Sequence, residues 1–548
     1  MFKKGFTLVE LLAIIVILAI IALIATPIVK DSIANSKNQA LKETINSIER
    51  AAYNYGYQND IGYDTNYKKL TLDELISKGF LKGDIINPVT NEKMNGCVLY
   101  RWNETNNQYE FKYNEECPKY PESLINVLLE QYSESNTTGL VKDATNENLY
   151  YYTGTNEEVA NNFLWYGGHQ WRVLEFDASA KILTLVTQQP LTAIQPASAV
   201  WETQSAYESS YINTWLNDYF YNSLDSSIQA TIQDSTFNIG IYTDVDEITT
   251  QRKVGLLDVD QYKRAGDANS FLDIKDAFWL GNRNSSSRVC YVHNEGYLSN
   301  LSLAFADGVR AVIKISDITI TSGDGTLASN YQVGNKATNT NNVQVGEYIN
   351  VPYNGSDSAC GSDNVCIFRV VSKNNSSIKV VLNGLLPTKS KWADYANDNI
   401  TTSDKIYTNV LNGFIANIDS KYITTGTFGV GMYASEDSYV VPQSTTISAS
   451  VGSPTIGEMF TCNDIDLGIT KKFVDANTIE NPTVSYDYWT MNRYDSVGVR
   501  RVNDSGPLNT VTPSYSGGVR AVIYLKSGAS AITFTGGEGT AQSPYTLQ

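Results

Sequence analysis

The sequence predicts an α+β protein with a long N-terminal helix, a small α+β head and two duplicated, mostly antiparallel α+β domains. Three observations lead to this prediction. An almost uninterrupted apolar run occupies residues 6–29, two alternating segments flank an Asn-rich turn between Cys97 and Cys117, and motifs of 136–335 recur in 336–548. The length of 548 residues is enough for several domains.

The charge distribution separates the two ends of the chain. Lys and Arg number 41 against 58 Asp and Glu, which gives a net charge of −17. Basic and acidic residues balance in 1–120, so the acidic excess belongs to 121–548. An acidic, tyrosine-rich part of this kind is typical of a solvated extracellular surface, and it makes nucleic acid an unlikely partner.

The apolar run at 6–29 predicts a helix that can span a bilayer. Lys3 and Lys4 precede it and should stay cytoplasmic, so the rest of the chain should cross the membrane. A secretory signal peptide is the alternative. The run is long for the apolar region of a signal peptide, and no A-x-A-like cleavage site precedes a clean mature start.

Glu10 is the acidic residue inside this run. A charge at membrane depth costs roughly 2.5–3.5 kcal/mol on insertion scales, so Glu10 needs a partner. A cut after Gly5 would create an amino group on Phe6, one helical turn from Glu10. In a filament, the amine of one subunit could pair with Glu10 of its neighbour.

The order K-G, then F-T-L-V-E and an apolar helix, resembles the N-terminus of type IV prepilins. The resemblance covers about the first 30 residues. It implies that 1–5 is a leader, and that a prepilin peptidase cuts between Gly5 and Phe6 and methylates the amine of Phe6. Pro27 lies where pilins commonly carry a proline, which would kink or locally unwind the helix.

We expect the helix to cover 6–58, a length of about 78 Å for Phe6 to Tyr57. Apolar residues recur beyond the membrane segment at helical steps of three and four, which predicts a stripe that packs against a head domain. The stripe consists of Leu41, Ile45, Ile48, Ala52 and Tyr55.

The head is expected over 59–120. Thr71, followed three residues later by Glu74, predicts the start of a short helix over 70–81. A β-hairpin should follow, with Cys97 and Cys117 at its ends, where a disulfide would stabilise the fold by roughly 3 kcal/mol. This segment resembles small pilin-like proteins of Gram-positive bacteria.

A linker helix over 121–135 should lead into the repeats, 136–335 and 336–548. The segment FWLGNRN matches YWTMNRY, and GVRAVIKI (308–315) matches GVRAVIYL (518–525). Alternation predicts that GVRAVIKI is one strand. The matched positions are candidates for ligand binding or for locking the repeat fold, and these positions are Trp279, Arg283, Arg310, Trp489, Arg493 and Arg520. For the arginines we favour the locking interpretation.

The repeats resemble a domain common in surface proteins of Firmicutes, with a late GVRPV-type strand and a closing G-x-G-T…PY. Ala311 and Ala521 replace the usual proline. A looser similarity connects them to C-type-lectin-like folds.

Signals for catalysis are weak. The two histidines, His169 and His293, have no metal-ligand spacing, and neither a nucleophile motif nor a phosphate-binding loop is present. We therefore expect no enzyme, no cofactor and no metal. Asp464 and Asp466 do not complete a calcium-binding loop. A surface hydrolase would need a carboxylate pair that the spacing does not reveal.

The other cysteines divide into two groups. Cys360 and Cys366 flank a short turn and should pair as a clip, whereas Cys290 and Cys462 either bridge the repeats or stay as buried thiols.

The sequence predicts a minor type IV pilin at a filament tip that displays two domains for adhesion to glycan or protein. The precursor should sit in the cell membrane of a Gram-positive bacterium by a single pass, and the mature protein on an extracellular filament. The expected partners are prepilin peptidase and other pilin subunits. The alternative is a pseudopilin of a type II secretion or competence-type system that binds exported cargo or DNA.

Overall fold

The computed structural model describes residues 7–59, 61, 68–103, 106–117, 119–197, 199–243, 248–303, 305, 307–334, 336–361, 364–395, 399–432, 445–455, 487–502 and 508–548. The chain divides into two compact units. One consists of Met1–Glu122 with Thr319–Thr321, and the other of Ser123–Ile318 with Ser322–Gln548. Below they are called the N-terminal unit and the C-terminal unit.

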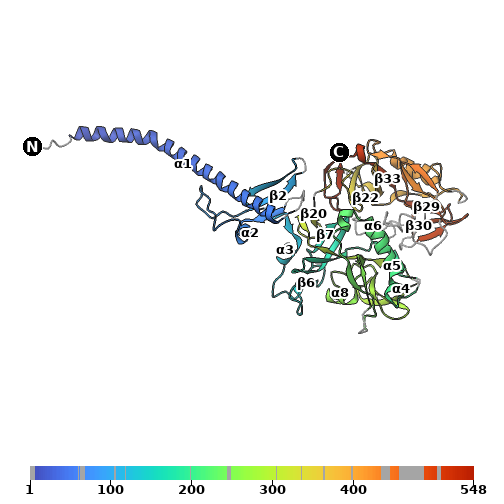
Figure 1. Cartoon of the computed structure of the whole chain (residues 1–548). Helices are drawn as coiled ribbons and strands as arrows, with labels where there is room; N and C mark the ends of the chain where they lie inside the picture. The colour runs from blue at the N-terminus through green and yellow to red at the C-terminus, as the bar shows by residue number, and fades with distance from the viewer. Residues whose placement is uncertain are drawn as a thin grey trace, which may run out of the picture. The chain divides into compact units, whose positions relative to one another are not determined.

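Helix α1 (Leu8–Asn59) opens the N-terminal unit as one long element (Figure 1). The sequence predicted a helix over 6–58; the helix begins two residues later, after Thr7, and ends at Asn59, while Phe6 lies outside the described residues. The helix continues through Pro27 without a break, so the unwinding that we considered there is not seen.

The rest of the N-terminal unit is a small head. It contains β1 (Lys68–Thr71), α2 (Leu72–Ser77), β2 (Cys97–Asn103) and β3 (Gln108–Asn114). The strands form an antiparallel sheet in the order β1-β2-β3, which confirms the predicted hairpin. The predicted helix also exists, but it ends at Ser77 rather than Leu81.

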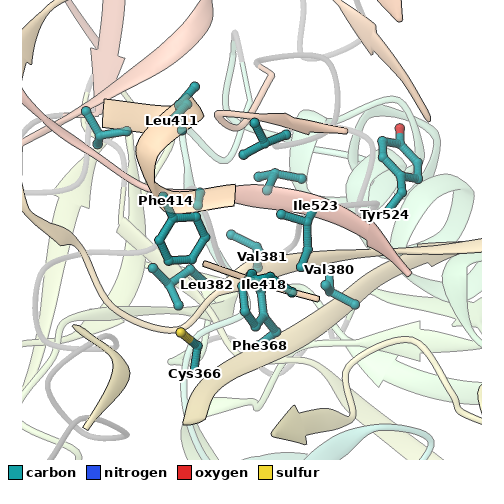
Figure 2. Close-up of a cluster of buried hydrophobic side chains, with 14 of the residues drawn as sticks. Cys366, Phe368, Val380, Val381, Leu382, Leu411, Phe414, Ile418, Ile523 and Tyr524 are labelled. Carbon is teal, nitrogen blue, oxygen red and sulfur yellow. The ribbon is translucent and has the colours of Figure 1, made fainter. Parts of the chain in front are cut away.

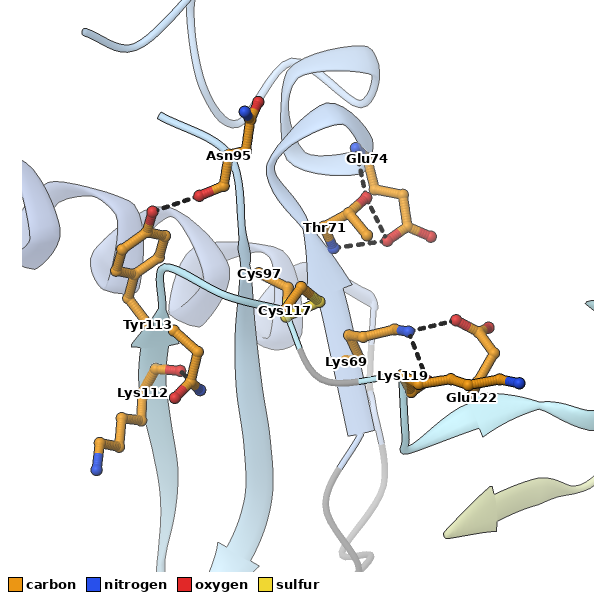
Figure 3. The surroundings of a disulfide bond; sticks show 11 residues. Lys69, Thr71, Glu74, Asn95, Cys97, Lys112, Tyr113, Cys117, Lys119 and Glu122 are labelled. Atoms are coloured by element: carbon orange, nitrogen blue, oxygen red, sulfur yellow. Dashed lines mark hydrogen bonds and ion pairs between the residues drawn. A yellow bond between two sulfur atoms is a disulfide. The ribbon is translucent and has the colours of Figure 1, made fainter. Parts of the chain in front are cut away.

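Local hydrogen bonds explain the start of α2. The Thr71 hydroxyl accepts from the Glu74 N–H at 3.2 Å, and the Glu74 carboxylate accepts from the Thr71 N–H at 2.8 Å (Figure 3). This reciprocal capping box is the arrangement that the sequence predicted. The helix ends before Gly79, whose positive φ of 79° suits the turn after a helix.

The disulfide Cys97–Cys117 joins the start of β2 to the segment after β3, as expected (Figure 3). Beside it, the Lys69 ammonium donates to the Lys119 carbonyl and forms an ion pair with Glu122. These contacts hold the last residues of the head against the sheet.

The C-terminal half of α1 packs against the head through the predicted stripe. Ile48 and Ala52 are buried, and Leu41, Ile45 and Tyr55 are partly buried against the same cluster. The facing side chains of the head are Leu70, Leu72, Leu75, Met94 and Val98.

The first half of the C-terminal unit contains two main sheets. The larger has the order β13-β18-β9-β8-β7-β20, with β6 on β8 and β5 on β6. The smaller has the order β10-β17-β14-β15-β16. The strands are β5 (Gly139–Lys142), β6 (Leu149–Thr153), β7 (Phe163–Tyr166), β8 (His169–Asp177), β9 (Ile182–Thr187), β10 (Thr192–Ile194), β13 (Val254–Gly255), β14 (Phe278–Arg283), β15 (Arg288–Val292), β16 (Leu298–Ser302), β17 (Asp307–Val309), β18 (Val312–Ser316) and β20 (Tyr331–Val333).

Short helices and one strand pair complete this half. They are α3 (Leu124–Leu129), α4 (Gln204–Glu208), α5 (Tyr211–Thr214), the π-helix η1 (Trp215–Phe220), α6 (Tyr221–Ser223), α7 (Ser226–Gln229), α8 (Val259–Arg264), β11 (Ser235–Asn238) and β12 (Thr249–Arg252). The short strands β4 (Glu122–Ser123) and β19 (Thr319–Ser322) lie where the chain passes from one unit to the other.

The second half has the same strand orders. One sheet runs β28-β33-β23-β22-β21-β35, with β25 also on β33 and β34 on β35, and the other runs β24-β32-β29-β30-β31. The strands are β21 (Tyr348–Pro352), β22 (Val365–Lys373), β23 (Ser377–Leu382), β24 (Leu386–Lys391), β25 (Ile423–Thr424), β28 (Val451–Gly452), β29 (Tyr488–Arg493), β30 (Val499–Val502), β31 (Leu508–Val511), β32 (Ser516–Val519), β33 (Val522–Lys526), β34 (Phe534–Gly536) and β35 (Tyr545–Leu547). The smaller elements are η2 (Ser358–Cys360), η3 (Tyr407–Leu411), α9 (Asn412–Ile415), β26 (Gly426–Gly429), β27 (Thr446–Ala449) and η4 (Gly528–Ser530).

The correspondence extends to strand directions and irregularities. The pairs β7–β20 and β21–β35 are both parallel, as are β14–β17 and β29–β32, within otherwise antiparallel sheets. The register also shifts at equivalent places, within β14 and within β29. The mixture of short helices and many strands confirms the α+β class.

The segment GVRAVIKI is not the single strand that we predicted. It divides into β17 and β18, which belong to different sheets, and Arg310-Ala311 forms the crossing. The second half crosses between β32 and β33 at Arg520-Ala521. Apolar side chains on both faces of this segment are buried, so alternation could not reveal the crossing.

The core of the second half lies between its large sheet and the η3–α9 segment (Figure 2). Phe368 and Leu382 on the sheet pack with Leu411 and Phe414 from the helical side. Cys360 and Cys366 form the expected disulfide, which clips η2 to β22. The free thiol of Cys290 is buried, and Cys462 lies outside the described residues.

We predict that Ile48→Ala destabilises the head by about 2–4 kcal/mol, because it opens a cavity between α1 and the sheet. Hydrogen exchange of peptides from 97–114 measures the loss. Ile33→Ala on the same helix is the control, since Ile33 is 53% exposed and Ile48 only 1%. Equal protection in the two variants would contradict the packing described.

Candidate functional site

The start of α1 carries the residues that the sequence linked to processing and assembly. Gly5 and Phe6 lie outside the described residues. Thr7 and Glu10 form a second capping box: the Thr7 N–H and hydroxyl both donate to the Glu10 carboxylate at 2.9 Å, and the Glu10 N–H donates to the Thr7 hydroxyl at 3.4 Å. The helix dipole also favours a carboxylate at this end.

Sequence reasoning missed this box, although its T-x-x-E signature is the one recognised at Thr71 and Glu74. Its consequence is that the Glu10 carboxylate is held at the first turn of α1. A cut at Gly5 would create a new amino group four residues before Glu10 in the sequence. A carboxylate fixed in this way is suited to receive a cation.

The first half of α1 leaves its apolar side chains uncovered. Every large apolar side chain described there is exposed, and these are Leu8, Val9, Leu11, Leu12, Ile14, Ile15, Val16, Ile17, Leu18, Ile20, Ile21, Leu23, Val29 and Ile33. Within the part of the chain that the structure describes, no helix meets the length and apolar character of a membrane span. The expected span of 6–29 includes Phe6 and Pro27, whose side chains are not described.

The matched tryptophans of the C-terminal unit are fully buried and have equivalent partners. The Trp279 Nε1–H donates to the Ile194 carbonyl of β10 at 3.0 Å, and the Trp489 Nε1–H donates to the Ser390 carbonyl of β24 at 2.7 Å. Each indole therefore fastens the edge strand of its sheet. These contacts favour the locking role over ligand binding.

The matched arginines Arg310 and Arg520 are buried at the sheet crossings. The Arg310 Nε–H donates to the Thr187 carbonyl, and the Arg520 Nε–H donates to the Leu382 carbonyl, both at 2.8 Å. Each guanidinium lies over an aromatic ring, Phe278 or Tyr488. Both arginines hold the crossing in place, whereas Arg283 and Arg493 are half-buried at the ends of β14 and β29.

The two halves of the C-terminal unit meet at a pair of glycines. A Cβ added to Gly168 would lie 1.9 Å from the Val345 carbonyl oxygen, and one added to Gly346 would lie 2.2 Å from the Gly168 carbonyl oxygen. Both glycines have a positive φ, so a side chain is excluded at each for steric and conformational reasons.

Arg369 connects the halves across this contact. Its Nε–H donates to the Gly346 carbonyl at 2.9 Å, and its Nη2 approaches the Gly168 carbonyl at 3.4 Å and His169 Nδ1 at 3.5 Å. The equivalent residue of the first half, Arg172, instead bonds to Asn156, Val159 and Asn162 within its own half. The guanidinium of Arg369 thus bonds to the other half, whereas the guanidinium of Arg172 bonds only within its own half.

An ion pair adds to the same contact. The Lys373 ammonium lies 2.9 Å from the Asp225 carboxylate of the other half and also donates to the Val343 carbonyl. The rings of Trp165 and Tyr348 lie 6.2 Å apart, centroid to centroid. Sequence reasoning did not identify any of these residues, because they come together only when the halves pack.

Glu347 occupies a buried position beside this contact. Its carboxyl accepts from the Gln344 N–H at 2.7 Å and from the Tyr545 hydroxyl at 3.2 Å. Burial raises the pKa of Glu347 to about 8. A cavity of about 60 Å³ lies next to it, between Trp165, Lys336 and Glu538.

Metal ligation has no support among the described residues, where no group of three or more His, Cys, Asp or Glu side chains could hold an ion. Asp464 and Asp466 lie outside the described part of the chain. His293 stacks on Tyr297 at 4.6 Å, and His169 lies among Trp171, Phe220 and Arg369.

Comparison with known families identifies the N-terminal segment. A family model described as the prokaryotic N-terminal methylation motif matches residues 1–26. The match supports a type IV pilin-like or pseudopilin-like protein, and it implies processing by a prepilin peptidase, membrane anchoring and assembly with other pilin subunits. No curated protein and no solved structure matches the chain.

We predict that Glu347→Gln removes a pH dependence from the C-terminal unit. A carboxyl whose pKa is raised by folding favours the folded state when it is protonated. This contribution to stability is present at low pH and is lost as the pH rises from about 4.5 through about 8. The variant should therefore match the wild type at pH 4.5 and be more stable by about 2–4 kcal/mol at pH 9. Thermal unfolding at the two pH values measures this.

The matched control is Glu538→Gln, which changes a less buried acid of the same cavity that pairs with Lys336. If the wild type and Glu347→Gln lost the same free energy of unfolding between pH 4.5 and 9, Glu347 would not be the titrating group.

Proposed function

We propose that this chain is a minor type IV pilin that carries its C-terminal unit at a filament tip for adhesion. The observation that supports the filament role most strongly is the combination of the methylation motif at 1–26 with an uncovered apolar helix. The precursor would be anchored in the membrane of a Gram-positive cell, and the helix would enter the filament core after the cut at Gly5.

In the filament, α1 would be covered by the same helix of neighbouring subunits. Burial of apolar side chains is worth about 25 cal/mol per Å², so a stretch with this many exposed Leu, Ile and Val residues has a large gain from association. The carboxylate of Glu10 would then pair with the methylated amine of Phe6 from a neighbour. In a dry core this pairing offsets part of the cost of burying both charges.

We infer that the two halves of the C-terminal unit are copies of one domain. Equal strand orders, equal strand directions and equivalent Trp and Arg contacts support a duplication. Tandem copies enlarge the displayed surface, which suits binding to glycan or protein. The similarity to C-type-lectin-like folds stays a prediction.

The size of the C-terminal unit argues for the tip. About 420 residues have a radius of gyration near 22 Å, whereas packed helices of a filament core lie about 10 Å apart. Such a unit at every subunit would crowd its neighbours along the filament, but a single copy at the end meets no such limit.

We predict that Glu10→Ala and Glu10→Gln are both cut at Gly5 but enter filaments at least tenfold less than the wild type. The glutamine side chain in Glu10→Gln still accepts a hydrogen bond from Thr7, as in other capping boxes. It lacks the negative charge that would pair with the amine of a neighbouring subunit. Immunoblots of sheared filaments and of membranes measure incorporation and processing.

Glu43→Gln is the control, because Glu43 is exposed on the same helix. Normal incorporation of Glu10→Gln would refute the pairing with Phe6. If Glu10→Ala alone failed, the role of Glu10 would be the local cap and not intersubunit pairing.

The adhesive role has a separate test. A deletion strain should lose attachment to glycan-coated or protein-coated surfaces. Normal attachment together with lost export or transformation would instead assign the chain to the pseudopilins of a secretion or competence-type system.

A further inference from the structure

A small cavity lies where the two halves of the C-terminal unit meet. Its volume is about 30 Å³, and its walls include Trp165, His169, Gln170, Tyr348, Arg369 and Gln542. It is separate from the larger cavity beside Glu347, although Trp165 borders both. A volume of this size is about that of two water positions, which is also the space that the two oxygens of a carboxylate need.

His169 lines the cavity and carries a buried ring nitrogen without a hydrogen-bond partner. Its Nδ1 lies 3.5 Å from Arg369 Nη2, which can only donate, so Nδ1 is the acceptor and the proton of the neutral ring sits on Nε2. His169 is 2% exposed, and Nε2 has no hydrogen-bond partner. A buried donor without an acceptor is costly, so the fold alone does not account for it.

Trp165 adds a second such donor. It is 7% exposed, and its Nε1–H has no hydrogen-bond partner. Most other buried indoles of the unit donate to a backbone carbonyl, as the following residues do: Trp171, Trp201, Trp279, Trp392 and Trp489. The indole N–H of Trp215 is also buried without a partner, but of these two tryptophans only Trp165 lines the cavity.

The charge around the cavity is positive, although the protein as a whole is strongly acidic. Arg369 is 5% exposed and lines the wall, and no acidic side chain of the described residues does so. The buried carboxyl of Glu347 and the Glu538–Lys336 pair border the other cavity.

We propose that this cavity binds a carboxylate group presented by an extracellular ligand. The carboxylate oxygens accept from His169 Nε2–H and Trp165 Nε1–H, and the Arg369 guanidinium supplies the compensating charge. Hydrogen bonds to a charged acceptor are the strong kind, and burial strengthens them further. A sugar acid and the C-terminus of a peptide share this chemistry.

The surroundings of His169 favour the neutral form of its ring. Burial and the nearby Arg369 hold the pKa of His169 well below its usual value. Trp171 and Phe220, which also pack on the ring, carry no charge, and the Lys373–Asp225 pair spans the same contact. A neutral ring keeps Nδ1 as the acceptor for Arg369 and Nε2–H as the donor for the carboxylate.

The test uses the full chain in detergent, labelled with ¹⁵N-histidine. The chain has two histidines, so His293→Gln leaves the His169 signals alone in the spectrum. Acetate is the probe and acetamide its neutral match. We expect a saturable shift of the His169 ring signals with acetate only. No saturable shift, or the same shift with acetamide, would overturn the proposal.

Trp165→Phe removes the indole N–H while keeping an aromatic ring, and should weaken acetate binding at least threefold. Trp171→Phe is the control, since its indole N–H is bonded to the Tyr166 carbonyl. Unchanged affinity in Trp165→Phe would contradict the site as described.

Glucuronate, a sugar acid, and N-acetylglycine, which mimics a peptide C-terminus, then distinguish the two sources of the carboxylate. The compound that matches the natural ligand should bind more tightly than acetate. Filament assembly plays no part in this measurement, so its failure and the failure of the proposed filament role are independent.

Discussion

The uncovered apolar surface of α1 is the constraint on which the rest of this molecule depends. More than a dozen large apolar side chains between Leu8 and Ile33 are exposed, while the stripe from Leu41 to Tyr55 packs on the head. One helix thus has two environments. Its first half is suited to cover by lipid or by other pilin subunits, and its second half is covered by its own chain.

In the C-terminal unit, specific contacts hold two similar halves in one arrangement. Arg310 and Arg520 fix the point where each half passes between its sheets. Arg369 and the glycine pair at 168 and 346 then join the halves. A unit with a fixed internal arrangement can form a binding site from residues of both halves, which flexibly tethered domains cannot do.

Local features of the sequence predicted much of the fold. The helix start at Thr71, the hairpin between the paired cysteines and the apolar stripe of α1 all depend on neighbours in sequence. The repeated motifs were also visible, because equal order and spacing do not require knowledge of the fold.

The features that sequence reasoning missed depend on distant contacts. The crossing at Arg310-Ala311 was hidden because both faces of the segment are buried. The contact of His169 with Arg369 joins residues 200 positions apart, and no local sequence pattern predicts it. The capping box at Thr7 was the exception, since its signature was present and was overlooked because Glu10 was considered only as a membrane charge.

We propose that α1 carries the C-terminal unit to the end of a filament. Electron microscopy of sheared filaments with gold-labelled antibody against residues 136–548 tests it directly. The account predicts gold at filament ends. Gold along the whole length would contradict the tip position, and gold confined to the cell envelope would contradict the filament role itself.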